Sequence, residues 1–79
     1  MLLPLTSVQQ KVFDCLAKLF IKESYPPTAR EIAAIAGMKT VSGELVALRK
    51  KGWAEKVENL HARSTKPTDE AIERFKKVN

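Results

Sequence analysis

Apolar residues recur at intervals of three and four along the first third of the chain, the spacing that places side chains on one face of an α-helix. The series predicts a helix over Ser7–Lys22. Thr6 stands just before it and is followed three residues later by Gln9, a pair whose side chains satisfy backbone N–H groups at a helix start. The apolar positions on this face are Val8, Val12, Cys15, Leu16, Leu19 and Phe20, with Phe13 and Ile21 widening it.

Two shorter helices follow a stiff proline link. Thr28 and Glu31 repeat the capping pattern and predict a helix over Ala29–Ala36, which Gly37 ends because glycine adopts positive φ without steric cost. A second apolar series predicts a helix over Thr40–Lys51. We expect burial of Ile32, Ala33, Ile35 and Ala36 in the first of these helices and of Val41, Leu45 and Leu48 in the second.

The pattern then changes from helical spacing to alternation. Trp53–Val57 alternates apolar and polar residues, which predicts a half-buried strand with Trp53 and Val57 on one side. Arg63–Lys66 is expected to return as a second strand. A last helix is predicted over Asp69–Val78, with acidic residues in its first turn and basic residues in its last. Its apolar side comprises Ala71, Ile72, Phe75 and Val78.

This order of three helices, a β-hairpin and a terminal helix is the winged helix-turn-helix arrangement. The sequence thus predicts a mainly α fold with a small wing of two or three strands. At 79 residues the chain is expected to form one domain, residues 1–79.

Composition narrows the function classes. Fourteen basic and nine acidic residues give a formal net charge of +5, which favours a phosphate-bearing partner. The single cysteine, Cys15, excludes an internal disulfide and is expected to be a small core residue of a protein from a reducing compartment. The opening residues are too few for a signal peptide, and no apolar run reaches membrane-spanning length. We therefore expect a cytoplasmic protein without membrane contact, associated with the nucleoid when bound to DNA.

Catalysis and cofactor binding are not expected. One histidine and one cysteine cannot assemble a zinc site of ordinary spacing, and no glycine-rich phosphate loop is present. No nucleophile, base and orienting group form a set. The sequence thus predicts neither an enzyme nor a cofactor.

The first half of the chain resembles the DNA-binding domain of LexA repressors. The likeness rests on the run LTSVQQ at Leu5–Gln10 and the run PPTAREIA at Pro26–Ala33, and it extends over Leu5–Gly37 and more loosely to Gly52. It implies a winged helix whose third helix enters the major groove of double-stranded DNA. The segment from Gly37 to Gly52 is shorter than in that family, and the terminal helix is more like those of MarR-type regulators, which often support dimerisation. The implied partners are double-stranded DNA and either a second copy, bound through the C-terminal helix, or a larger protein.

The face of the third helix opposite its buried stripe is the expected DNA-contacting surface. It lacks Arg, Asn and Gln, the side chains that most often read bases by paired hydrogen bonds, so base contacts should be few and affinity should depend strongly on salt. Arg49 lies beside the buried stripe and is expected to contact a phosphate or an acidic neighbour. On the wing, His61, Arg63 and Lys66 are placed to reach the minor groove or the backbone, and the alternative is that they are solvated loop charges. The candidate DNA-binding residues are Thr28, Arg30, Lys39, Thr40, Ser42, Gly43, Val46, Ala47, Lys50, Arg63 and Lys66.

Several of these assignments have a structural alternative. Gly43 costs helix stability, and either close approach of a backbone or simple drift explains it. Thr28 and Arg30 suit a phosphate at a helix start, but a helix cap and a solvated charge look the same in sequence. For the whole chain the alternative function is a winged-helix protein-interaction module, whose contacts would be Val46, Ala47 and Trp53 and whose binding would resist salt.

Overall fold

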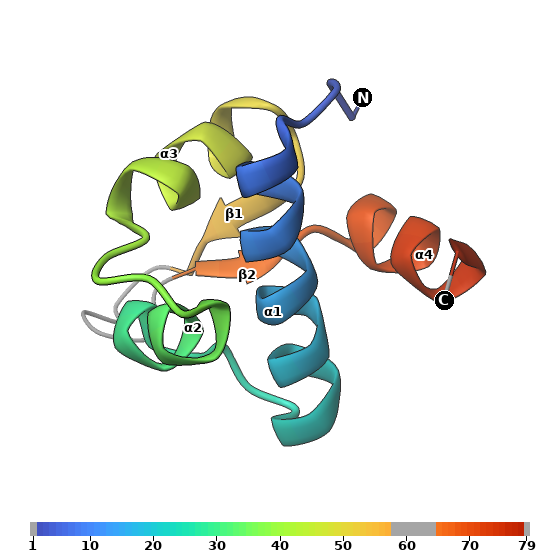
Figure 1. Ribbon diagram of the computed structural model, residues 1–79. Helices are drawn as coiled ribbons and strands as arrows, with labels where there is room; N and C mark the ends of the chain where they lie inside the picture. The colour runs from blue at the N-terminus through green and yellow to red at the C-terminus, as the bar shows by residue number, and fades with distance from the viewer. Residues whose placement is uncertain (1, 58–64, 79) are drawn as a thin grey trace.

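The computed structural model describes residues 2–57 and 65–78. Within them four helices and a two-stranded hairpin follow one another in the predicted order (Figure 1). The mainly α fold with a small wing is therefore confirmed. The elements are α1 (Ser7–Glu23), α2 (Ala29–Ala36), α3 (Ser42–Lys50), β1 (Ala54–Lys56), β2 (Thr65–Pro67) and α4 (Asp69–Val78).

Both predicted capping boxes are present. Thr6 Oγ1 accepts the Gln9 N–H at 3.2 Å, and Gln9 Oε1 accepts the Thr6 N–H at 3.1 Å. At α2, Thr28 Oγ1 accepts the Glu31 N–H at 3.0 Å while Glu31 Oε1 accepts the Thr28 N–H at 2.8 Å. These pairs fix where α1 and α2 begin, because each satisfies two backbone donors that lack a helical partner.

The predicted start of the third helix is wrong by two residues. The helix begins at Ser42 rather than Thr40, and its N-cap, Val41, makes no side-chain capping bond. Thr40 Oγ1 instead accepts the Ser42 N–H at 3.4 Å, a local bond by which a threonine hydroxyl competes with helix formation. At the other end Lys51 is the C-cap, and Gly52 follows at φ +90°.

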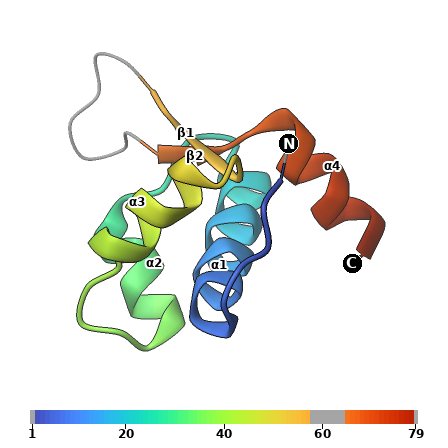
Figure 2. The ribbon, with the colours of Figure 1, turned by 90° about the horizontal axis from the view of Figure 1, so that it is seen from above.

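The core lies between α1 and the elements on both sides of it. Figure 2 shows α2 and α3 on one side of α1 and α4 on the other. Phe13 of α1 is the central aromatic residue: its ring meets those of Trp53 and Phe75 edge-on, with centroids 5.0 Å and 6.1 Å away. The buried apolar residues are Val12, Phe13, Cys15, Leu16, Ala17, Ile32, Ala33, Ala36, Val41, Leu45, Leu48, Trp53, Ala54, Ala71 and Phe75.

Three residues predicted to be buried are exposed. Ile35 has 59% of its surface exposed, because α2 turns Ala33 and Ala36 inward and Ile35 lies about 100° around the helix from Ala36. Val8 and Ile21 are also exposed, near the two ends of α1. Periodicity identifies the inward face of a helix but not how far along it the neighbouring elements extend.

The first strand is shorter than predicted, and the second ends at Pro67, one residue later than predicted, while the first two residues of its predicted range lie outside the described residues. β1 and β2 pair antiparallel, with Ala54 opposite Pro67 and Lys56 opposite Thr65. Trp53 precedes β1 rather than lying in it and is only 6% exposed, so the expectation that it offers a surface contact is wrong. Its indole Nε1 donates to the Leu3 carbonyl at 2.6 Å, which satisfies its polar atom inside the core.

Cys15 is buried in the face of α1, as expected of a core residue. Burial raises the pKa of the Cys15 thiol above its ordinary value of 9.0, an effect that the nearby Lys18 partly opposes. In the described part of the chain, no helix is long and apolar enough to cross a membrane. The same residues include no cluster of three or more His, Cys, Asp or Glu side chains suited to a metal ion.

Candidate nucleic-acid interface

The outward face of α3 carries Gly43, Val46, Ala47 and Lys50 as the sequence predicted, whereas Lys39, which was placed on the same face, precedes the helix. Val41, Leu45 and Leu48 are buried, as predicted, and this fixes the rotation of the helix. The exposed positions are consequently Ser42, Gly43, Val46 and Lys50, with Ala47 half-buried beside them. Ser42, Val46 and Lys50 follow one another at intervals of four residues, so a hydroxyl, an apolar and a cationic side chain form one row along the helix.

Gly43 borders this row, and a side chain there would meet nothing. A Cβ built on Gly43 has no heavy atom within 4 Å outside its own helical turn. Of the explanations considered for this glycine, close approach by another part of the described chain is therefore excluded. The open space around Gly43 still leaves room for a bound molecule to approach the helix closely, and drift also stays open.

A shallow hollow separates the start of α2 from the turn that leads into α3. Its volume is about 190 Å³, and the polar residues on its rim are Arg30, Lys39 and Thr40. Ala29, Ala33 and Val41 supply its apolar lining. Three of the predicted DNA-binding residues, which come from α2 and from the turn before α3, therefore lie around the same hollow.

Thr28 lies at the start of α2, but its hydrogen-bonding groups are partly engaged. Its hydroxyl oxygen and backbone N–H both serve the capping box with Glu31. The donors of the first turn that such a cap does not use are the N–H groups of Ala29 and Arg30. The geometry therefore shows that Thr28 caps α2, and a phosphate contact remains a prediction.

Arg49 has a partner that the sequence did not indicate. Its guanidinium Nη1 donates to the hydroxyl of Thr65 on β2 at 2.9 Å, where a phosphate or an acidic neighbour was expected. Thr65 is 4% exposed. The bond thus joins α3 to the wing across 16 residues of sequence, a separation that local patterns do not encode.

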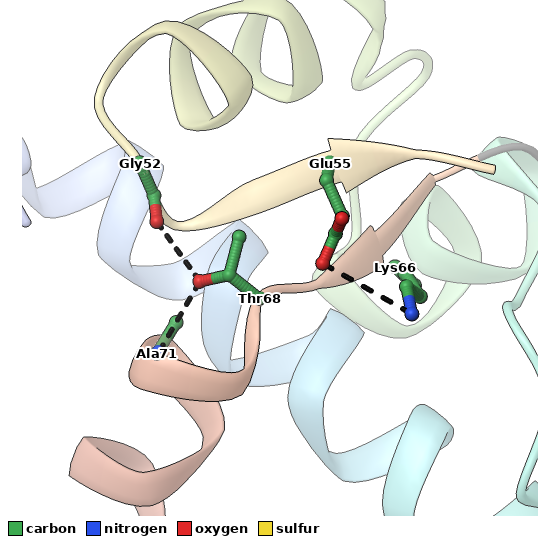
Figure 3. Close-up of polar contacts among 5 residues, drawn as sticks. All are labelled: Gly52, Glu55, Lys66, Thr68 and Ala71. Atoms are coloured by element: carbon green, nitrogen blue, oxygen red, sulfur yellow. Dashed lines mark hydrogen bonds and ion pairs between the residues drawn. The ribbon is translucent and has the colours of Figure 1, made fainter.

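The wing carries cations on both strands. Lys66 lies opposite Glu55, with its Nζ 4.0 Å from Glu55 Oε2 (Figure 3), so part of its charge is balanced within the hairpin. Lys56, the last residue of β1, is exposed and was not among the predicted contacts, although its polar position in the alternating run could have suggested it. The predicted contacts Arg63 and His61 lie outside the described residues.

Thr68 joins three elements at the base of the hairpin. Its hydroxyl donates to the Gly52 carbonyl at 2.9 Å and accepts the Ala71 N–H at 3.2 Å (Figure 3), and its own N–H donates to the Trp53 carbonyl at 3.1 Å. The end of α3, the hairpin and the first turn of α4 are thereby fixed to one another.

The N-terminal segment is bonded to the residues that follow α3. The Leu3 N–H donates to the Lys51 carbonyl at 3.0 Å, and Lys51 Nζ donates to Gln9 Oε1 at 2.7 Å. Gln9 Oε1 is also the acceptor in the cap of α1. Lys51 therefore holds the end of α3 against the start of α1 and is engaged within the domain.

Three packed helices, an exposed α3 face with Lys50 at its end and an adjoining hairpin define a winged helix DNA-binding domain. The chain belongs to the LexA DNA-binding domain family, whose model matches residues 2–64. A LexA repressor of Sorangium cellulosum (strain So ce56) is 35% identical over 68 residues, which cover 82% of this chain and 29% of that protein. A LexA repressor of Methylococcus capsulatus (strain ATCC 33009 / NCIMB 11132 / Bath) is 38% identical over 55 residues, covering 66% of this chain and 27% of that protein.

The chain therefore spans less than a third of the length of these relatives. The matched part includes α1, α2, α3 and β1, which contain most of the candidate DNA-binding residues. The helix α4 lies beyond the matched range.

Proposed function

We propose that this protein binds double-stranded DNA as a transcriptional regulator, with α3 in the major groove and the wing beside it. The observation that carries the proposal is the row of Ser42, Val46 and Lys50 on the exposed face of α3, opposite a fully buried stripe. An α-helix fits the major groove of B-DNA, where a hydroxyl can bond a base edge and Val46 can contact a thymine methyl. Membership of a DNA-binding domain family supports the same reading.

Phosphate contacts would come from the cationic positions around that helix. Arg30, Lys39 and Thr40 surround one hollow beside the N-terminal end of α3, which suits a backbone phosphate. Thr28, at the start of α2, and Gly43 and Ala47, on the α3 face, complete the contact surface on the helices. On the wing, Lys66 and Arg63 would contact the backbone or the minor groove.

Selectivity would need a second recognition unit, because the α3 face offers few base-reading groups. The 1–79 unit would act as one domain in the cytoplasm, associated with the nucleoid when bound. A second copy could pair through α4, whose outward residues include Asp69, Glu73 and Lys76 beside the half-buried Ile72. Because Phe75 and Ala71 are buried in the core, such a pairing would be largely polar.

A protein-interaction module is the second candidate. Val46 is 40% exposed and Ile35 59% exposed, and such apolar surface favours contact with a protein. Binding through these side chains would resist salt, whereas binding to phosphates weakens as salt rises. The burial of Trp53 removes one of the contacts that this alternative would use.

The test is a titration of labelled mixed-sequence duplex, followed by fluorescence anisotropy over a series of salt concentrations. The variants are Lys39→Glu and Lys50→Glu, with Lys18→Glu on the exposed face of α1 as a control of equal charge change. We expect the wild-type chain to bind at low salt and the first two variants to bind more weakly. Each should also reduce the slope of log affinity against log salt by about 1.

The affinity of the Lys18→Glu control should stay closer to that of the wild type, because this change alters the overall charge and not the proposed contact surface. Absence of duplex binding by the wild-type chain at low salt would contradict the proposed function. Equal losses in all three variants would show general attraction to DNA without a defined surface.

A further inference from the structure

Among the described residues, hydrogen bonds from Thr68 and from Arg49 hold the hairpin to the neighbouring elements at two places. Its base is held by Thr68, whose N–H and hydroxyl bond the Trp53 and Gly52 carbonyls. The second attachment is Arg49, which bonds Thr65 at the first residue of β2. Thr65 and Thr68 are three positions apart in extended chain, a span of about 10 Å.

Two attachments at this separation constrain the hairpin more than either alone. Burial of Ala54 and Pro67 already seats the base of the hairpin in the core, and the Arg49 bond adds a directional contact to α3 near its far end. Thr65 lies opposite Lys56, the last residue of β1, so the Arg49 bond acts at the end of the described ladder that is remote from the base.

Both partners of this bond are removed from solvent, Thr65 almost wholly and Arg49 in part. Thr65 is the buried polar residue among those described, and its hydroxyl is satisfied by Arg49. Arg49 is half-buried on α3, next to the buried Leu48. Its guanidinium Nη1 reaches across to Thr65 on β2.

We propose that Arg49 is a positioning residue for DNA binding: its bond to Thr65 fixes the angle between the wing and the recognition helix. This inference rests on the proposed function, since the angle matters when both elements contact one duplex. Arg49 itself then makes no phosphate contact. Loss of the bond leaves the phosphate-contacting charges in place but misaligns the two surfaces.

The experiment compares two ways of breaking the bond. Arg49→Met removes the guanidinium, and Thr65→Val removes the hydroxyl while Arg49 keeps its charge. Thr65→Ser retains the hydroxyl and serves as the conservative control. Duplex affinity is measured over a salt series, well below the unfolding midpoint of each variant, and stability is measured in parallel by urea unfolding.

We expect Arg49→Met and Thr65→Val each to weaken duplex binding by about threefold to tenfold, the range that one hydrogen bond spans. The salt slope should stay at the wild-type value in both, and the double variant should lose no more than either single variant. Thr65→Ser should bind within about twofold of the wild type, because the bond survives.

Three results would overturn the proposal. If Arg49→Met lowers the salt slope by about 1 while Thr65→Val binds as the wild type does, Arg49 contacts a phosphate. If both variants lose stability but keep wild-type affinity, the bond is structural only. If the wild-type chain binds no duplex at all, the proposed function fails first and the positioning role fails with it.

Discussion

Gly43 reduces the helical propensity of α3 at a position where the chain itself leaves room for a side chain. A Cβ there has no neighbour within 4 Å, and the residue is exposed. Gly43→Ala should therefore raise the free energy of unfolding, by about 0.5–1 kcal/mol, because alanine restricts the unfolded chain and favours the helix. Urea unfolding followed by helical circular dichroism measures the change.

Gly37→Ala is the matched control, since Gly37 has equally open surroundings but a φ of +72°. That backbone conformation disfavours an L side chain, so this variant should be less stable than the wild type. A loss of stability in Gly43→Ala would contradict the reading of Gly43 as a position free of internal contacts. If Gly43→Ala is more stable yet binds duplex more weakly, the glycine is retained for close approach to DNA.

At the scale of elements, the N-terminal segment secures the end of α3 through the indole of Trp53. The variant Trp53→Phe keeps an aromatic ring but leaves the Leu3 carbonyl without its indole donor. The free energy of unfolding should fall by about 1–3 kcal/mol, the cost of an unsatisfied group in a part-buried place together with lost packing. Circular dichroism is the suitable probe, because the variant lacks the chain's single tryptophan.

The control is Leu3→Ala, which preserves the Leu3 carbonyl and shortens a side chain that is already exposed. It should cost clearly less than Trp53→Phe. Limited proteolysis gives a second readout, since release of the N-terminal segment should speed cleavage within residues 2–6. Equal stability of Trp53→Phe and the wild type would contradict an anchoring role for this bond.

The elements also show which information the sequence carries locally. Both capping boxes were predictable because donor and acceptor lie three residues apart, and so the helix starts at Ser7 and Ala29 were correct. The α3 start was not, because Thr40 bonds the Ser42 amide rather than capping the helix. Ile35 was misassigned since α2 has two overlapping apolar faces, and only packing against α1 selects between them.

The candidate site divides in the same way. The outward row on α3 followed from the inward stripe, so Ser42, Val46 and Lys50 could be placed from spacing alone. The Arg49–Thr65 and Trp53–Leu3 bonds join residues 16 and 50 positions apart, and nothing in the local pattern of either partner signals the other. Both contacts arise from tertiary structure, which single-sequence patterns do not specify.

At the scale of the whole molecule, α4 belongs to the same core as the helices that would meet DNA, although it lies beyond the family match. Phe75 packs edge-on against Phe13, Ala71 is fully buried, and Arg74 lies over the Trp53 ring at 5.6 Å. Figure 1 shows α4 beside α1, on the far side from α2 and α3. A small chain buries little apolar surface, so the loss of one such aromatic residue should be felt throughout the domain.

Phe75→Ala should therefore lower the free energy of unfolding by about 3 kcal/mol, a large share of the stability of a chain this small. If residues 1–79 form one cooperative unit, unfolding of the variant, followed by Trp53 fluorescence and by helical circular dichroism, should still give coincident transitions. Lys76→Ala, an exposed change on the same helix, should alter stability by no more than about 0.5 kcal/mol. A separate early loss of helical signal, with Trp53 fluorescence unchanged, would show instead that α4 unfolds independently of α1, α2 and α3.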